Sequence, residues 1–512
     1  MKLSNNVKQT NERTNNNDND YLSLIISELN DVYPEKFSQT IHLISTRKNV
    51  FNKYKREITN NINFAKNNSN LMWFSFLVGC RFNDSDFVNL LISNFDFNNI
   101  YENENNENNA NNANNTNLAK FAKGIYHLKK GQTPQAKDLL WEVYQNNIYY
   151  FEHRDFVDLH NLLVEFSCID ELKTLLEYLT KTYPQIIEYQ RYYLDFLINN
   201  TKDENLAENN TIKQLINFIL QNAKDSNDWQ QLSMCFYNLG DIENFYKYFE
   251  KAVLNLVYHP NIFELSTKNK NDKFPAEVFL NKVNEVLQIL QDAGEQPFPD
   301  GGTLLGLYRD GKLMDYDKDT DIGILVNNND DVIRIINIIS ASKNFSCPAI
   351  SQLNFNKEIL NISVRNKQSG VFTDIFFFHK KGDFIYEGIN TKTSNLYWKY
   401  SAFDLIKTKF NNTEYYIPNN IELYLTELFG KNWNEHISVW DSLINCPNIT
   451  PESKLVVYYY GTMRMHEALR QHKYAKALNY YTTLKDRWQY PFTSEMSAKI
   501  ESYLEKIKAK QQ

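Results

Sequence analysis

Cysteine is scarce in this 512-residue sequence, and the few cysteines are scattered without a CxxC pair. An odd, dispersed set argues against a disulfide framework and against a cysteine-based zinc site. We therefore expect the protein to work in a reducing compartment. The five cysteines are Cys80, Cys168, Cys235, Cys347 and Cys446.

Long apolar runs and basic tracts are missing as well. The longest apolar run, Leu71 to Cys80, is about half the length of a membrane-spanning helix. The polar residues 1–20 hold no signal-peptide core, and the formal net charge of -7 argues against a nucleic-acid binder with a basic surface. We therefore expect no transmembrane segment, no nucleic-acid partner, and a location in the cytoplasm or peripherally at the inner face of the membrane.

Several catalytic signatures are absent too. The sequence has no GxSxG element and no GxxxxGK[ST] P-loop, and its nine histidines form no HExxH or HxxxH set. These absences argue against a serine hydrolase, a P-loop kinase and a histidine-bound zinc enzyme.

Aromatic residues are plentiful instead, with 33 Tyr and 33 Phe, and the chain is long enough for two or three domains with aromatic-rich cores. Composition and hydrophobic periodicity change several times along it. We predict disorder at 1–20, amphipathic helices at 21–100, an Asn-rich linker at 101–117, helical repeats at 118–265, a catalytic domain at 266–445 and a helical region at 446–512.

The segment 118–265 has the pattern of stacked helical hairpins. Measured from Trp229, the spacing of its large, small and glycine residues resembles that of the tetratricopeptide repeat, and an irregular helical bundle is the alternative. A concave helical surface of this kind would suit a protein partner better than chemistry. The residues that carry the spacing are Trp229, Leu232, Ser233, Phe236, Gly240, Phe249 and Ala252.

The pattern changes after about residue 266. A helical stretch at 275–294 is followed by short strands at 322–326, 358–364 and 371–378, with an amphipathic helix at 330–340 between the first two. Strands that alternate with helices predict an α/β or α+β catalytic domain.

A glycine pair opens the first feature with chemical potential. Gly301, Gly302 and Thr303 precede the apolar helical stretch LLGLY. Glycines let backbone N–H groups approach a phosphate closely, and a helix start adds a favourable dipole. A simple tight turn is the alternative when the pair is considered alone.

An acidic run follows, in which Asp315, Asp317, Asp319 and Asp321 alternate before an apolar strand. Residues two apart in an extended segment share a face, so Asp319 and Asp321 should project together. Carboxylates that share a face repel one another unless a cation lies between them, and hard oxygen ligands suit Mg²⁺ or Mn²⁺. A solvated acidic loop is the alternative.

A third acid, Asp374, lies inside the aromatic strand VFTDIFFF. An acid buried there without a partner is costly. We therefore predict that Asp374 completes a metal site from a neighbouring strand. The alternative is an edge strand on which Asp374 faces water.

These motifs together resemble a known family. GGTLLGLYRDGKLMDYDKDTDIGI (301–324) is similar to the signature of the LicD/fukutin family, a branch of the polymerase-β-like nucleotidyltransferase superfamily. VFTDIFFF resembles the strand with the third acid, and the segment 403–433 resembles the closing module of the family. The matching positions of that module are Phe403, Pro418, Tyr424, Leu425, Gly430 and Trp433.

The resemblance covers about 295–440 and departs from the family pattern at two places. Lys318 interrupts the usual Asp-Asp-Asp run, and Tyr316 stands where Trp or His is usual. The pair Asp319 and Asp321 survives both changes.

Together with the helical patterns on either side of it, the resemblance implies an α+β multidomain protein, in which tetratricopeptide-like helices precede a mixed-sheet nucleotidyltransferase domain and a C-terminal helical segment. It implies transfer of phosphocholine, ribitol phosphate or glycerol phosphate from a CDP-linked donor to a glycan hydroxyl, in capsule or lipopolysaccharide synthesis. Asp319, Asp321 and Asp374 would hold Mg²⁺ or Mn²⁺ and be catalytic. Gly301, Gly302, Thr303, Arg309 and Lys318 would contact the donor phosphates.

Two other functions remain open from the sequence. The same fold can transfer a nucleotide to a small molecule or a protein instead of a phospho-alcohol. Alternatively, the helical repeats are the working part, and the protein is a non-catalytic scaffold for glycan assembly.

Overall fold

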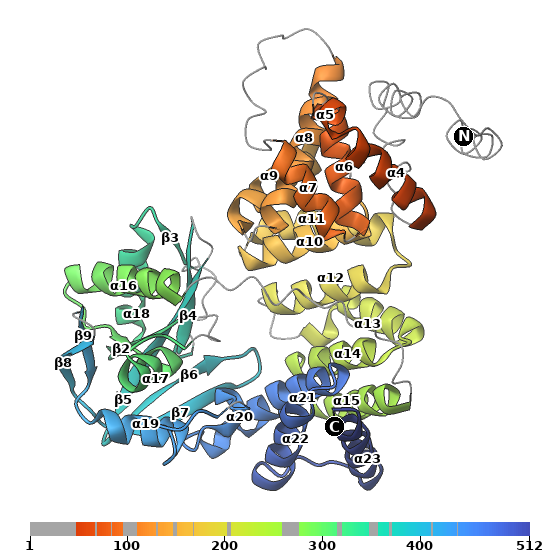
Figure 1. Cartoon of the computed structure of the whole chain (residues 1–512). Coiled ribbons are helices and arrows are strands. Elements are labelled where there is room, and N and C mark those ends of the chain that lie inside the picture. Colours follow the sequence, from red (N-terminus) through yellow and green to blue (C-terminus); the bar gives the residue numbers. More distant parts are fainter. Residues whose placement is uncertain are drawn as a thin grey trace. The chain divides into compact units, whose positions relative to one another are not determined.

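The structure is a computed structural model in which two compact units, 1–172 and 173–512, are distinguished. Figure 1 shows its elements in chain order. The residues that the structure describes are 48–66, 69–82, 84–95, 110–129, 132–146, 151–166, 168–201, 206–258, 276–314, 320–347, 357–367, 371–410, 413–437 and 439–511.

The first unit is helical throughout its described part. The apolar run that the sequence analysis singled out, Leu71 to Cys80, is buried along its whole length in α6. The Arg81 guanidinium at the end of that helix pairs with Glu152 at 2.8 Å and with Asp155 at 2.7 Å, which ties α6 to the start of α10. The helices are α4 (Lys48–Asn60), α5 (Ile62–Ala65), α6 (Ser69–Phe82), α7 (Ser85–Asn94), α8 (Ala110–Lys129), α9 (Thr133–Asn146) and α10 (His153–Glu165), and α11 (Ile169–Thr182) crosses into the second unit.

The Asn-rich segment differs in part from the sequence prediction. Residues 110–117, which composition assigns to a linker, form the first turns of α8. Helix formation is cooperative, so a packed stretch such as the one around the buried Phe121 can extend into a polar flank. Residues 101–109, and the predicted disorder at 1–20, lie outside the described residues.

Four α-helices open the second unit after α11, and two of them form a tight hairpin. Trp229 and Phe249 are buried between α14 and α15, and the Ser233 hydroxyl donates to the Phe245 carbonyl at 2.7 Å inside the seam. Gly240, at φ +78°, turns the chain between them. Tetratricopeptide architecture stays a prediction. The helices are α12 (Ile187–Asn200), the short η4 (Leu206–Glu208), α13 (Asn210–Asn222), α14 (Ser226–Asn238) and α15 (Ile242–Tyr258).

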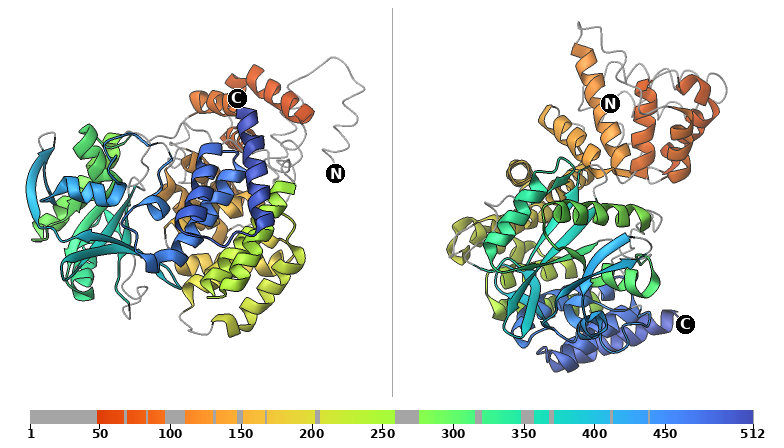
Figure 2. Two further views of the ribbon diagram at one scale, coloured as in Figure 1. Left: turned by 90° about the horizontal axis from the view of Figure 1, so that it is seen from below. Right: turned by 90° about the vertical axis from the view of Figure 1, so that its left-hand side faces the viewer.

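The C-terminal helices pack on this hairpin, as the left view of Figure 2 shows for the blue segment. Tyr237 of α14 lies 4.4 Å from Tyr459 of α21, and Tyr246 of α15 lies 5.5 Å from Tyr490, measured between ring centroids. The helices that precede and follow the sheet therefore share one core. They are α20 (Ser442–Asn445), η6 (Pro451–Ser453), α21 (Lys454–Arg470), α22 (Tyr474–Thr482), η7 (Thr483–Arg487) and α23 (Ser494–Gln511).

A seven-stranded mixed sheet lies between these two helical segments in sequence. The order of its first five strands is β1-β2-β5-β4-β3. β6 pairs antiparallel with the last three residues of β5 and with β7. Only β2 and β5 are parallel among the paired strands of the described residues. The strands are β1 (Phe298–Pro299), β2 (Asp321–Val326), β3 (Phe345–Ser346), β4 (Asn361–Asn366), β5 (Phe372–Lys381), β6 (Phe384–Asn390) and β7 (Asn395–Ser401).

Helices α16 and α18 lie side by side against β2 (Figure 1), and α17 connects β1 to β2. A separate ribbon of β8 and β9 contacts β1. Helices before a mixed-sheet domain, and more helices after it, confirm the predicted α+β arrangement. The remaining elements are α16 (Ala276–Asp292), α17 (Gly301–Asp310), α18 (Asn329–Ser340), β8 (Leu405–Phe410), β9 (Thr413–Pro418) and α19 (Ile421–Phe429).

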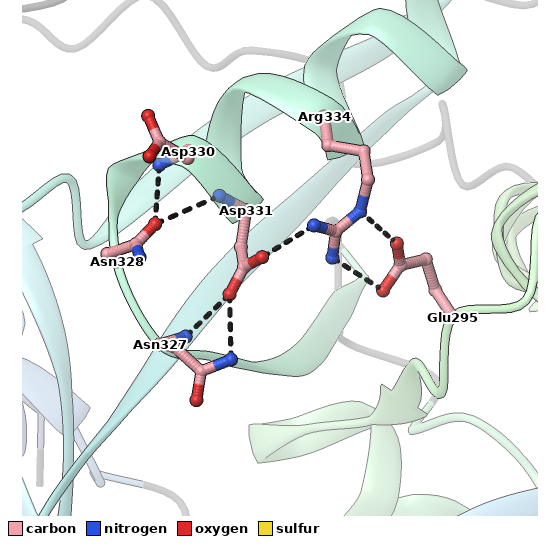
Figure 3. Close-up of polar contacts among 6 residues, drawn as sticks. All are labelled: Glu295, Asn327, Asn328, Asp330, Asp331 and Arg334. Atoms are coloured by element: carbon pink, nitrogen blue, oxygen red, sulfur yellow. Dashed lines mark hydrogen bonds and ion pairs between the residues drawn. The ribbon is translucent and has the colours of Figure 1, made fainter.

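The far end of β2 is fixed by a polar junction (Figure 3). Asn328 caps α18 by accepting from the backbone N–H groups of Asp330 and Asp331. Arg334 then joins Asp331, at 2.5 Å, to Glu295 of the loop after α16, at 2.7 Å. The hydrogen bond from the backbone N–H of Asn327 lowers the pKa of Asp331, and Arg334 contributes to this effect. The Asp331 carboxylate therefore has a structural role at the start of α18.

No helix within the described ranges is long and apolar enough to cross a membrane.

The turn between β6 and β7 docks on the helices, and this contact yields a first prediction. The Lys392 ammonium donates to the carbonyls of Ile198 and Thr201 at the C-terminal end of α12. A cation at a helix C-terminus stabilises the end carbonyls and the helix dipole. We expect Lys392→Met to lower the free energy of unfolding by about 1 kcal/mol. Urea unfolding of the full chain measures it, with the exposed Lys380→Met as control. Equal midpoints for both variants would contradict the contact.

Candidate active site

Asp321 and Asp374 lie directly opposite each other on the two parallel strands. Asp321 is the first residue of β2, and the strand register pairs it with Asp374 of β5. The antiparallel neighbour β4 places Ser363 opposite Asp374. Because register partners on adjacent strands point to the same face, the three side chains form one row across the sheet. The two carboxylates are half-buried and Ser363 is exposed, so the row borders solvent.

Buried hydroxyls hold this row in register. Thr320 donates to the Phe372 carbonyl at 3.2 Å and shares a hydrogen bond of 2.9 Å with Thr373. Thr320 and Thr373 are almost fully buried. The Asp374 backbone N–H donates to the Thr320 carbonyl at 2.8 Å, and the Ser363 hydroxyl donates to Asp374 Oδ1. The chain therefore enters β2 at a fixed position beside Asp374.

The start of α17 meets the same edge of the sheet. Asp300 caps the helix by accepting from the Gly301 N–H at 2.6 Å, and its own N–H donates to the Asp321 carbonyl at 3.0 Å. Gly301 has φ +50°, and a Cβ at this position would lie 3.0 Å from Asp321 Oδ2. The glycine therefore leaves room for the Asp321 carboxylate, which a larger residue would fill.

The Thr303 side chain supports the backbone of the site, whereas the sequence predicted that it contacts phosphate. Its side chain is buried, and its hydroxyl accepts from the Asp321 N–H at 2.9 Å. The hydroxyl thus fixes the first residue of β2. Because the Thr303 hydroxyl is already used, only its backbone N–H can make the predicted contact with phosphate. The phosphate contact of Gly302, in the same helix turn, also stays a prediction.

Arg309 lies at the opposite end of α17, about 12 Å along the helix from Gly301 at 1.5 Å per residue. It pairs with Asp310 at 2.9 Å and donates to the carbonyls of Trp433 and Glu435 at 3.4 and 3.3 Å. Arg309 thus attaches the segment after α19 to α17. Its contact with donor phosphate stays a prediction.

Asp319 and Lys318 lie outside the described residues, between 314 and 320. Asp319 directly precedes Thr320 in the chain, and Thr320 is hydrogen-bonded to Phe372 and Thr373. The metal role of Asp319 and the phosphate role of Lys318 therefore stay predictions from the sequence.

A second group of polar side chains is fully buried behind Gly301. The carboxyl groups of Asp300 and Glu387 interact with each other, and the hydroxyls of Tyr424 and Tyr400 donate to Asp300 and Glu387 respectively. Burial raises the pKa of Asp300, against the hydrogen bonds of Tyr424, Glu387 and Gly301. Burial also raises the pKa of Glu387, and the negative charge of Asp300 adds to this effect.

Comparison with known proteins bears on the same residues. A family model described as the nucleotidyltransferase domain of LicD/FKTN/FKRP matches residues 294–420. This range contains Gly301, Asp321 and Asp374. Residues 294–420 are a domain of the LicD/fukutin family.

Curated relatives of the LicD-type domain come from mammals. The chain is 29% identical over 182 residues to the mouse protein named ribitol-5-phosphate transferase FKTN, and 27% identical over 182 residues to its human counterpart. Each match covers 34% of this chain and 38% of the relative. The chain thus matches well under half the length of these relatives.

The carboxylate pair of the LicD-type domain fits a divalent cation. Two aspartates on one face of adjacent strands bring hard oxygen ligands together, and Gly301 adds no side chain of its own beside Asp321 Oδ2. Among the described residues this pair is available, and they hold no cluster of three acidic, histidine or cysteine ligands.

Asp300, Ser363 and Glu387 are among the residues of the LicD-type domain that sequence reasoning missed. Asp300 could have been found, because an acid directly before a glycine-rich helix start is a common N-cap. Ser363 could not, because its place beside Asp374 depends on strand register. Glu387 follows Tyr386 in a strand that the sequence analysis did not predict, so its burial was not foreseeable.

Proposed function

We propose that this protein transfers a phosphorylated alcohol from a CDP-linked donor to a glycan hydroxyl, with divalent cations held by the LicD-type domain. The observation that carries the proposal is the direct pairing of Asp321 with Asp374 beside the glycine turn of α17. The printed name of the relatives favours ribitol phosphate as the transferred group.

The reaction exchanges one bond to phosphorus for another. The acceptor oxygen forms a bond to the phosphorus of the phospho-alcohol, and the bond from that phosphorus to the bridging oxygen of the diphosphate breaks. CMP leaves, and the acceptor hydroxyl gives up its proton. Bound Mg²⁺ or Mn²⁺ would neutralise charge on the diphosphate and lower the pKa of the attacking hydroxyl.

The residues of the chain divide this work among them. Asp321 and Asp374, with Asp319 from the sequence prediction, would hold the cations. Asp374 would also accept the acceptor proton, and the hydrogen bond from Ser363 orients its carboxylate for this step. The first turn of α17 would bind a donor phosphate through the backbone N–H groups of Gly302 and Thr303, because the Gly301 N–H already donates to Asp300. Gly301 itself would leave room for the phosphate.

An in-vitro screen tests the proposal. CDP-ribitol, CDP-glycerol and CDP-choline are each incubated with the full chain, a glycan array and Mg²⁺ or Mn²⁺, and CMP release and acceptor mass are measured. We expect CMP release and an acceptor that gains the mass of one phospho-alcohol, with the largest yield from CDP-ribitol.

Removal of metal gives a further prediction. EDTA should reduce turnover at least a hundredfold, because the diphosphate charge is then left without its counter-ions, and excess Mn²⁺ should restore it. Turnover that is unchanged in EDTA would contradict the cation site. An acceptor that gains a nucleotide monophosphate would show nucleotidyl transfer instead.

A further inference from the structure

Four polar side chains form a closed cluster in the interior of the LicD-type domain. They come from four separate elements: the cap of α17, β6, β7 and α19. Their exposed fractions are between 0 and 3%, and the rings of the two tyrosines stack with centroids 4.7 Å apart and an interplanar angle of 8°. The residues are Asp300, Glu387, Tyr400 and Tyr424.

Aromatic side chains surround the cluster, so its polar groups are buried at a cost in free energy. The Tyr424 ring packs against Phe403 and Phe378, with centroids 5.6 and 6.5 Å apart. Apolar side chains of similar volume could fill this space without the desolvation cost of two acids and two hydroxyls. We therefore look for the role of the cluster in the position at which it holds Asp300.

Hydrogen bonds make the cluster continuous. Tyr424 donates to Asp300 Oδ1, and Tyr400 donates to Glu387 Oε1. The carboxyl groups of Asp300 and Glu387 also interact with each other. Each acid is thus held by one tyrosine and by the other acid.

The cluster acts on the candidate site through Asp300. This residue fixes Gly301 through its side chain and the Asp321 carbonyl through its backbone N–H. A displacement of Asp300 would therefore move the glycine turn and the first residue of β2 together.

We propose that Glu387, Tyr400 and Tyr424 are positioning residues that, through Asp300, hold the first turn of α17 against Asp321. None of them contacts the reacting groups in this arrangement. The expected change in turnover rests on the proposed function. The expected change in the mobility of the α17 turn depends on the fold alone.

Hydrogen exchange of the full chain tests the positioning directly. Tyr424→Phe and Glu387→Leu should speed amide exchange in a peptide that spans 299–307. Glu387→Gln should not, because its amide can donate to Asp300 and accept from Tyr400. Tyr458→Phe is the matched control: it removes another buried tyrosine hydroxyl, which donates to the Trp488 carbonyl at 2.8 Å in the helical segment.

Turnover should follow the same order. We expect kcat/KM to fall about tenfold in Tyr424→Phe and to stay within about twofold of wild type in Glu387→Gln and in Tyr458→Phe. If Glu387→Leu fails to fold, the hydrogen exchange and turnover of Tyr424→Phe are sufficient to test the proposal. Unchanged exchange at 299–307 in Tyr424→Phe would overturn the proposal. Faster exchange with undiminished turnover would uphold the positioning and count against the α17 turn as a donor site, so the two proposals fail separately.

Discussion

Replacing Asp374 or Asp321 by Asn should lower kcat by about a thousandfold or more, while the fold remains native. Each substitution keeps the size of the side chain and removes one negative charge from a row that holds two in the described residues. The amide oxygen that remains is a much weaker ligand for a hard divalent cation. In Asp374→Asn the proposed proton acceptor is lost as well.

The control is Asp330→Asn, the same chemical change at an exposed acid in the first turn of α18, beyond the other end of β2. It should leave turnover within about twofold, because only a helix-dipole interaction is weakened. Circular dichroism checks the fold, and Mn²⁺ binding measured by electron paramagnetic resonance separates loss of cation from loss of chemistry. Wild-type turnover in Asp374→Asn would defeat the proposed enzyme.

Asp319→Asn extends the experiment to the acid that lies outside the described residues. A loss comparable with that of Asp321→Asn would support a site of three carboxylates, as the sequence predicts. A variant with normal turnover would leave a site formed by Asp321 and Asp374 alone.

Local pattern was sufficient for the elements that form the centre of the sheet. The predicted strands at 322–326 and 371–378, and the helix at 330–340, correspond to β2, β5 and α18 within a few residues at each end. The predicted strand at 358–364 begins later, as β4 at 361. The backbone N–H groups of Ile359 and Leu360 are bonded instead to the side chains of Asn329 and Asn390.

Elements that depend on distant partners were not predictable from local pattern. β8 has a mixed pattern of exposed and half-buried residues because it pairs only with β9, and β1 is two residues long. The joint packing of α14 and α15 with the C-terminal helices also joins residues as far apart in the chain as Tyr237 and Tyr459, or Tyr246 and Tyr490. No periodicity along one segment encodes such a contact.

The same distinction applies to the candidate site. The chemistry of Asp321, Asp374 and Gly301 could be read from residue type and motif, but their proximity depends on the parallel pairing of β2 with β5 and on the cap of α17. Thr303 shows the limit of motif reasoning, because its hydroxyl is used to hold the backbone of Asp321.

Gly301→Ala should lower kcat/KM about a hundredfold, although the substitution adds a single methyl group. Two costs arise at once. A non-glycine residue at φ +50° costs about 1 kcal/mol in the left-handed region. The new Cβ would also lie 3.0 Å from Asp321 Oδ2, a separation that the neighbour must relieve by moving. The Asp321 carboxylate is the end of a side chain, so its rotation is the easiest relief, and that rotation displaces a proposed cation ligand.

Gly382→Ala separates the two costs. Gly382 has φ +63° in the turn between β5 and β6, and a Cβ there would meet nothing within 4 Å. Both variants should therefore lose a similar free energy of unfolding, about 1 kcal/mol, but only Gly301→Ala should lose turnover and Mn²⁺ affinity. Equal turnover in the two variants would mean that the Asp321 carboxylate tolerates displacement, which a ligand of the reacting centre cannot do. The comparison thus tests the function of the glycine turn independently of its stability.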